Sequence, residues 1–181
     1  MFQKVLSQIE VYTGDIEGIE IAREKIRCDI FESYVLDRRI SDNLRDYAYQ
    51  DYKVNFSKPL GWMHDYVRDH FNLYHKKKLI LQKTWGNIYL PMETSFTRHQ
   101  VEPLLLRDSP DYTYIYNVDV KENSCEFVIE YDDHRRANNT WHLPLRNNEF
   151  IIFPSTQRYF ISKNKSDHLN VFVTSNCIYV T

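Results

Sequence analysis

Four histidines in the second half of the chain are the residues best suited to chemistry, because imidazole is the commonest metal-ligating side chain in proteins. His99 stands in a polar loop beside Arg98, and the other three are His134, His142 and His168. The imidazole of His99 could equally be a hydrogen-bonded group at the rim of a fold. No nucleophile elbow, P-loop, GxGxxG or HExxH motif occurs in the chain. This disfavours hydrolase, nucleotide-binding and zinc-protease functions.

The stretch 153–176, FPSTQRYFISKNKSDHLNVFVTSN, is a second segment whose residue types and spacing indicate a candidate site. It opens with Phe-Pro-Ser, and Asn170 and Asn176 stand six residues apart in an alternating segment. Tyr159 lies between these two features, and a packing role within a strand pair is the simplest interpretation for it.

Seven segments with a two-residue period predict the β-strands that would position these side chains: 79–90, 112–120, 125–133, 140–148, 149–155, 159–163 and 169–180. Turns rich in Asn, Asp and Ser separate the segments, and their spacing favours a two-sheet sandwich or barrel. The charged stretch YDDHRR at 131–136 indicates a solvated loop.

Helical spacing of apolar residues comes before the strands. It predicts one helix within 15–50 and another over 62–76, with a break near Pro59 and Gly61. Residues 2–12 could form an edge strand. Helices followed by strands predict one α+β domain over 1–181, mainly helical in 1–78, with the helices packed on one face of an antiparallel sheet.

Composition narrows the functional classes. The net charge is −2 with acidic and basic residues interleaved, so we expect no nucleic-acid partner. Cys28, Cys125 and Cys177 are widely spaced and are expected to be reduced thiols. No run approaches 18 apolar residues, and charges occur too early in the N-terminus for a signal peptide. We therefore expect no membrane contact and a location in the cytoplasm of the producing cell.

The β-rich part, residues 79–181, resembles the short 2-oxoglutarate/Fe(II)-dependent oxygenases common in bacteriophages and cyanobacteria. The order of five motifs carries this resemblance: TWGNIY (84–89), RHQVEP (98–103), YTYIYNV (112–118), HLPLRNNEFIIFPS (142–155) and NVFVTSN (170–176). It implies a double-stranded β-helix, that is, a jelly roll of two antiparallel sheets.

The resemblance also assigns a degenerate pocket. His99 corresponds to the first iron-binding histidine and is the one conventional ligand kept. Val101 stands where a carboxylate or second histidine belongs, and Tyr159 stands at the distal histidine position. Asn170 replaces the arginine that would pair with the far carboxylate of 2-oxoglutarate, and Asn176 matches the final asparagine of the motif. Iron held by two histidines and a carboxylate would lose most of its protein ligands here.

Two functions are expected from this pattern. The leading one is a non-catalytic oxygenase-fold protein, or pseudoenzyme, that uses no cofactor and acts through contacts with other proteins in a homo- or hetero-oligomer. By family analogy it could be a bacteriophage virion protein of the neck, tail or head. The alternative is a 2-oxoglutarate/Fe(II)-dependent dioxygenase with atypical metal ligands, in which His134, His142 or His168 could rebuild a site. A metal-free jelly roll that binds a small ligand is a third possibility.

Overall fold

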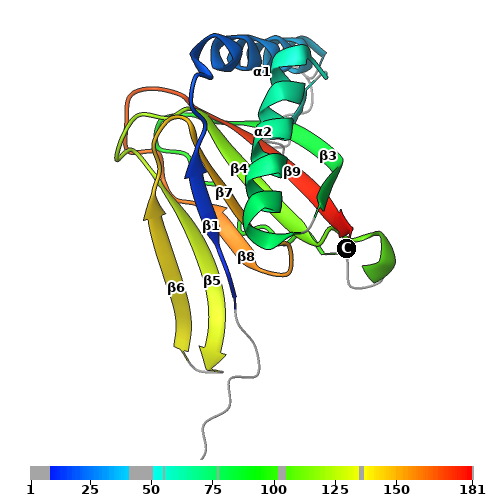
Figure 1. The fold of residues 1–181 in the computed structure, drawn as a ribbon. Coiled ribbons are helices and arrows are strands. Elements are labelled where there is room, and N and C mark those ends of the chain that lie inside the picture. Colours follow the sequence, from blue (N-terminus) through cyan, green and yellow to red (C-terminus); the bar gives the residue numbers. More distant parts are fainter. Residues whose placement is uncertain are drawn as a thin grey trace, which may run out of the picture.

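The computed structural model describes residues 9–40, 51–54, 56–76, 78–101, 105–134 and 137–180 (Figure 1). Two long helices and nine strands follow one another in the order β1 (Tyr12–Asp15), α1 (Glu20–Ile40), β2 (Asp51–Lys53), α2 (Lys58–His75), β3 (Lys78–Tyr89), β4 (Tyr112–Asp119), β5 (Glu126–His134), β6 (Ala137–Pro144), β7 (Glu149–Pro154), β8 (Arg158–Ile161) and β9 (Asn170–Val180). A short 3₁₀ helix, Leu106–Asp108, precedes β4.

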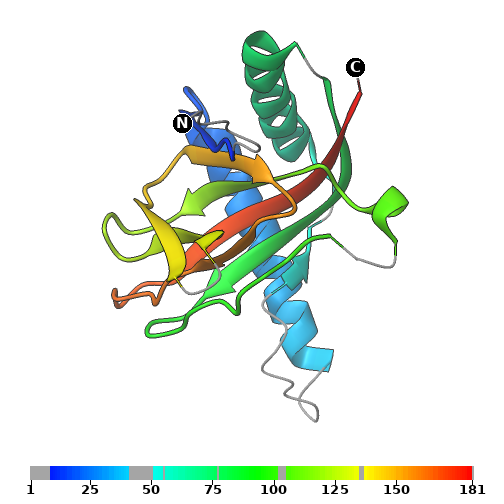
Figure 2. The same ribbon diagram turned by 90° about the horizontal axis from the view of Figure 1, so that it is seen from below.

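The strands form two antiparallel sheets. The larger sheet has the order β1-β7-β4-β9-β3-β2, and the smaller has the order β6-β5-β8. Figure 2 shows β9 running through the middle of the larger sheet, between β3 and β4. Both helices lie on one face of this sheet. The predicted α+β class and the two-sheet jelly roll with N-terminal helices on one face are confirmed.

Two hydrophobic layers explain why the strands of the larger sheet are apolar on both faces. Val171 and Val173 of β9 belong to the layer under the helices, whereas Phe172 belongs to the layer between the sheets. Successive residues of a strand face opposite sides of its sheet, so a strand buried on both sides loses the simple apolar–polar alternation. The same arrangement places alternate residues of β9 in the space between the sheets.

Helix α1 packs closely on the larger sheet. A Cβ atom added to Gly86 of β3 would lie 2.8 Å from the Ile30 side chain, so the glycine allows this close approach. Ile26 and Ile30 of the helix are fully buried. The TWGNIY motif is therefore also a packing motif.

Helix α2 begins earlier than predicted. Ser57 is its N-cap, and its side chain accepts a hydrogen bond from the Leu60 amide (3.4 Å). Pro59 lies in the first turn, where a missing N–H costs nothing and the fixed φ suits a helix. The predicted break at Pro59 and Gly61 is thus wrong: the proline starts the helix. At the other end Lys76 adopts a left-handed conformation as the C-cap.

Other boundaries differ as well. The edge strand is at Tyr12–Asp15 rather than within 2–12, and residues 1–8 lie outside the described part. The predicted loop at 131–136 is wrong for residues 131–134, which continue β5, while 135 and 136 are outside the described part. Strand β2 was not predicted. Within the described ranges, no helix is both long and apolar enough to cross a lipid bilayer.

Candidate functional site between the sheets

Strand β9 lines the space between the two sheets with every second residue. Asn170, Phe172, Thr174 and Asn176 all have at most 8% exposure and lie on the same face of the strand. The predicted site residues Asn170 and Asn176 therefore both face the interior. They lie near opposite ends of it, because six residues of strand span about 20 Å.

Tyr159 of β8 is buried between the sheets, and it is paired with Arg98. The two backbones exchange hydrogen bonds, with N···O distances of 2.7 Å and 3.1 Å. The Arg98 side chain is 16% exposed, whereas the next residue, His99, is exposed. The prediction that His99 lies in the pocket is wrong, because the pairing of Arg98 with Tyr159 leaves the neighbouring side chain on the solvent side. Val101 is partly buried.

A chain of side-chain hydrogen bonds starts at Tyr159. Gln100 Nε2 donates to the Tyr159 hydroxyl (3.1 Å), and Asn176 Nδ2 donates to Gln100 Oε1 (3.2 Å). Thr113 Oγ1 donates to Asn176 Oδ1 (3.0 Å) and lies 2.8 Å from Ser155 Oγ. Burial raises the pKa of Tyr159 to about 12, so its phenol keeps its proton at neutral pH. Its oxygen is a poor Fe(II) ligand in that form.

Arg98 belongs to a second polar group next to this chain. Its Nη1 donates to Asp51 Oδ1 (2.6 Å), and the same oxygen accepts a bond from Asn87 Nδ2 (2.6 Å). Thr174 Oγ1 donates to Asn87 Oδ1 (2.6 Å), which connects β2, β3 and β9. The Asp51 side chain is 40% exposed, so this group reaches from the interior to the surface.

Two buried N–H donors at this end have no acceptor within the described part of the chain: Arg98 Nε and the indole Nε1 of Trp85. Trp85 is 6% exposed and lies two residues before Asn87, on the same face of β3. The Lys83 ammonium group lies 5.3 Å from the centre of the Trp85 ring. A buried donor left without a partner typically costs about 1–3 kcal/mol. We refer to Trp85, Asn87, Arg98, Asp51 and Thr174 as the donor-rich end.

The donor-rich end is tightly packed. Tyr89, Ile115, Tyr159 and Phe172 surround Arg98 and leave no space for a sphere the size of a water molecule. A ligand that reaches the Arg98 guanidinium must therefore displace one of these side chains or the Asp51 carboxylate.

Asn170 marks the other end of the interior, about 13 Å from Thr174 along the strand. Its Nδ2 donates to Ser124 Oγ (2.9 Å) and lies 3.2 Å from Cys125 Sγ. Its Oδ1 accepts a bond from the Lys121 amide (3.3 Å). Every polar atom of this side chain has a partner, so it joins the β4–β5 turn to β9. We call Asn170, Ser124, Cys125 and the Lys121 amide the closed end.

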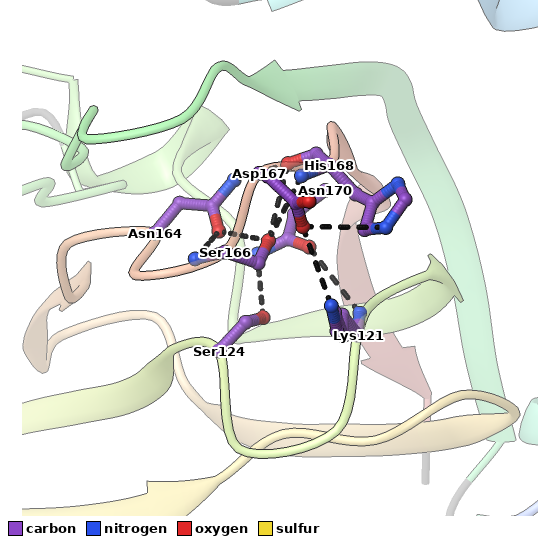
Figure 3. A network of polar contacts seen from close by, with 7 residues as sticks. All are labelled: Lys121, Ser124, Asn164, Ser166, Asp167, His168 and Asn170. Atoms are coloured by element: carbon purple, nitrogen blue, oxygen red, sulfur yellow. Dashed lines mark hydrogen bonds and ion pairs between the residues drawn. The ribbon is translucent and has the colours of Figure 1, made fainter.

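The loop before β9 covers the closed end (Figure 3). Asn164 Nδ2 donates to the carbonyl of His168 (2.7 Å), and its Oδ1 accepts a bond from the Ser166 hydroxyl (2.7 Å). Lys121 Nζ and His168 Nε2 each lie 3.3 Å from Asp167 Oδ1. His168 is therefore an exposed side chain beside the Lys121–Asp167 ion pair and does not face the interior.

The remaining histidines considered from the sequence also lie away from Tyr159. His142 is on the surface of β6, where Nδ1 contacts Glu126 (2.9 Å) and Nε2 contacts Thr140 (3.1 Å). His134 ends β5, and its side chain lies outside the described part. None of the described histidines joins Tyr159 in the interior.

Known structures share this fold. No protein-family model matches the chain, and no curated protein sequence matches it. A non-heme alpha ketoglutarate dependent carbocyclase, SnoK from nogalamycin biosynthesis, matches with a TM-score of 0.63 at 10% identity, over 92% of this chain and 78% of that one. The 2OG complex of viral collagen prolyl hydroxylase from Paramecium bursaria Chlorella virus-1 matches with a TM-score of 0.57 at 11% identity, over 94% of this chain and 97% of that one. An oxidoreductase of the 2OG-Fe(II) oxygenase family from Burkholderia pseudomallei matches with a TM-score of 0.52 at 8% identity, over 72% of this chain and 62% of that one. The chain has the double-stranded β-helix fold of these oxygenases.

These neighbours contradict the sequence-based prediction that no cofactor is involved. One is described as alpha ketoglutarate dependent, one is a 2OG complex, and one belongs to the 2OG-Fe(II) oxygenase family. By their descriptions these three neighbours are not virion proteins, so they give no support to the virion role that was the leading expectation.

The residues that the structure describes do not, however, fit a conventional iron site. They contain no group of three or more His, Cys, Asp or Glu side chains that could hold a metal ion. Non-haem iron oxygenases normally bind Fe(II) through two histidines and one carboxylate. Glu102 and the His134 side chain lie outside the described residues. The described side chains therefore support no catalytic step through iron.

Proposed function

We propose that the protein binds 2-oxoglutarate or a closely similar small carboxylate at the donor-rich end, in the manner of an atypical 2-oxoglutarate-dependent oxygenase. One observation carries this proposal. The guanidinium of Arg98 lies between the sheets with one N–H group unpartnered among the described residues.

The chemistry of the donors favours a carboxylate. A guanidinium is always protonated and offers planar, paired N–H groups that match carboxylate oxygens. Such charge-assisted hydrogen bonds are roughly twice as strong as neutral ones. Trp85 and Lys83 lie on the same face of β3 as Asn87, so the indole N–H adds a donor and the ammonium group adds a positive charge.

Asp51 sets the main obstacle to binding. Its carboxylate already pairs with Arg98, and two carboxylates near one guanidinium repel each other. Because Asp51 is 40% exposed, it can turn into water when a ligand arrives. Binding should therefore be accompanied by rearrangement of Asp51 and of the tyrosines around Arg98, which lowers the apparent affinity.

Calorimetry under anaerobic conditions tests the proposal, with 2-oxoglutarate titrated into the protein in the presence and absence of Fe(II). Dimethyl 2-oxoglutarate is the matched control, because it keeps the shape and removes both charges. Saturable binding of the acid and at least tenfold weaker binding of the ester are expected. Succinate release in air then distinguishes an oxygenase from a carboxylate-binding protein. Equal or absent binding of both compounds would refute the proposal.

We propose self-association as a second candidate function, supported by apolar side chains at the end of the β3–β9 pair. Ile80, Leu81, Tyr179 and Val180 are each 37–47% exposed on two adjacent strands. A stable interface would bury about 800 Å² on each copy. Light scattering of the protein and of its Tyr179→Lys variant is the test. A strictly monomeric wild type would reject this candidate.

A further inference from the structure

A separate cavity lies on the helix-side face of the larger sheet, between α2 and the edge strand β1. Its volume is about 280 Å³, and its aromatic lining comes from three elements: Tyr12, His70, Phe71, Tyr74, His75 and Phe150. Phe71 and Phe150 belong to the hydrophobic layer under the helices. The larger sheet therefore separates this cavity from the donor-rich end.

Two pairs of rings around the cavity meet at steep angles, whereas His75 is tilted at 57° to Tyr12 and at 36° to Phe71. The centres of Tyr12 and Phe71 are 5.5 Å apart with an angle of 84° between the ring planes. His70 and Phe150 are 6.1 Å apart at 74°. Rings arranged in this way present both faces and edges to one space. A flat aromatic guest can then form offset-stacked and edge-to-face contacts at the same time, which an aliphatic guest cannot.

Charge restricts the ligand further. The lining that the structure describes contains no Asp, Glu, Lys or Arg side chain. The Tyr12 hydroxyl donates to the carboxylate of Glu10, so a negative charge lies just outside the cavity and disfavours an anion. His70 and His75 place imidazole nitrogens in the lining, which can donate or accept a hydrogen bond.

We propose that this cavity binds a neutral, planar aromatic small molecule that carries a hydroxyl or ring N–H group. The volume is close to the lower end of the range for small-molecule pockets, about 300–1,000 Å³, so one ring or two fused rings would fit. This site is independent of carboxylate binding between the sheets.

Amide chemical shifts of the ¹⁵N-labelled protein test the proposal during titration with indole and with p-cresol. Two probes serve as controls: 4-methylcyclohexanol is similar in size to p-cresol but lacks a π system, and 4-hydroxybenzoate adds a negative charge. Saturable shifts confined to α2, β1 and β7 are expected for indole and p-cresol, with at least about threefold weaker binding of each control. No saturation by either aromatic probe, or equal binding of p-cresol and 4-methylcyclohexanol, would overturn the proposal.

The chain offers a matched pair of variants for the same titration. Leu73 and Tyr74 are neighbours on α2 and are both 79% exposed, but only Tyr74 lines the cavity. Neither substitution removes a buried side chain, so both variants should fold. Tyr74→Ala should weaken indole binding by about 2- to 10-fold, whereas Leu73→Ala should leave it unchanged. An equal effect of the two substitutions, or none from Tyr74→Ala, would show that the probes bind elsewhere.

Discussion

The two ends of the space between the sheets are both polar, but they satisfy their hydrogen bonds differently. At the closed end each polar atom of Asn170 has a partner in the β4–β5 turn. At the donor-rich end Arg98 Nε and Trp85 Nε1 have no acceptor among the described residues. A fully bonded network holds a structure together, whereas buried donors without acceptors indicate a place for another molecule.

This difference predicts different roles for the two ends. By the family resemblance, Asn170 occupies the position of the cosubstrate arginine, yet its contacts connect β9 to the β4–β5 turn. In the described part of the chain, it is Arg98 whose guanidinium faces this interior, and Arg98 lies on the segment that pairs with β8. We therefore expect substitutions at the closed end to lower stability and substitutions at the donor-rich end to lower ligand affinity.

The largest effect is expected for Tyr159→Ala, next to the donor-rich end. Tyr159 is 2% exposed and packs against Phe127 and Phe153, so truncation leaves a cavity and should lower the free energy of unfolding by about 3–5 kcal/mol. Tyr159→Phe keeps the ring and loses the bond from Gln100, at a cost of about 1 kcal/mol. Urea unfolding measures both. Similar losses in the two variants would mean that the hydroxyl, and not the ring volume, dominates.

The pH dependence of stability should come from the helix-side face rather than from either end. His64 of α2 is buried, is hydrogen-bonded to Tyr114, and has a pKa lowered to about 4 by burial. In the unfolded chain its pKa is about 6.5, so the unfolded state binds the proton more readily. The stability contributed by neutral His64 is complete above pH 6.5 and is lost as the pH falls toward 4, by up to about 3 kcal/mol.

Urea unfolding between pH 7.5 and pH 4 measures this loss for the wild type and for His64→Gln. The variant has no titrating imidazole here and should show a much smaller decline. Parallel profiles for the two proteins would assign the acid sensitivity to other groups.

A loss of about 1–3 kcal/mol is expected for Asn170→Ala at the closed end, because the Lys121 amide and the Ser124 hydroxyl lose their partner. His168→Ala in the adjacent loop is the control. This side chain is exposed, and its removal should change the free energy of unfolding by less than about 0.5 kcal/mol. Equal effects of the two substitutions would contradict the structural role of Asn170.

The smallest effect on stability is expected for Trp85→Phe at the donor-rich end. This change removes the unpartnered indole N–H, which favours the folded state, but it also removes buried ring volume, which opposes it. The free energy of unfolding should therefore change by less than about 1 kcal/mol. Chemical denaturation is again the measurement. A loss above about 2 kcal/mol would mean that the indole N–H is hydrogen-bonded in the folded protein.

Much of the fold could be predicted from the sequence because it depends on local patterns. The two-residue period over 79–180 predicted seven strands, and β3–β9 are the strands found there. Two features could not be predicted for local reasons. Proline disrupts helix interiors but suits first turns, so the pattern around Pro59 predicts a break where a helix in fact starts. Strand β2 is three residues long, too short to show a period.

The site was less predictable because it depends on contacts between distant segments. Tyr159, Asn170 and Asn176 were identified and are all buried. The sequence pattern points to His99 rather than to the adjacent Arg98, since only the pairing of this segment with β8 determines which of the two faces inward. A one-residue shift in pairing would exchange them.

Isothermal calorimetry with 2-oxoglutarate on three proteins tests the central claim most directly: the wild type, Arg98→Met and Asn170→Ser. The account predicts saturable binding to the wild type, at least tenfold weaker binding to Arg98→Met, and affinity within about twofold of the wild type for Asn170→Ser. Arg98→Met should remain folded, because the exposed part of Asp51 can be hydrated when its partner is removed. Unchanged binding to Arg98→Met, or loss of binding in Asn170→Ser alone, would contradict the assignment of the two ends.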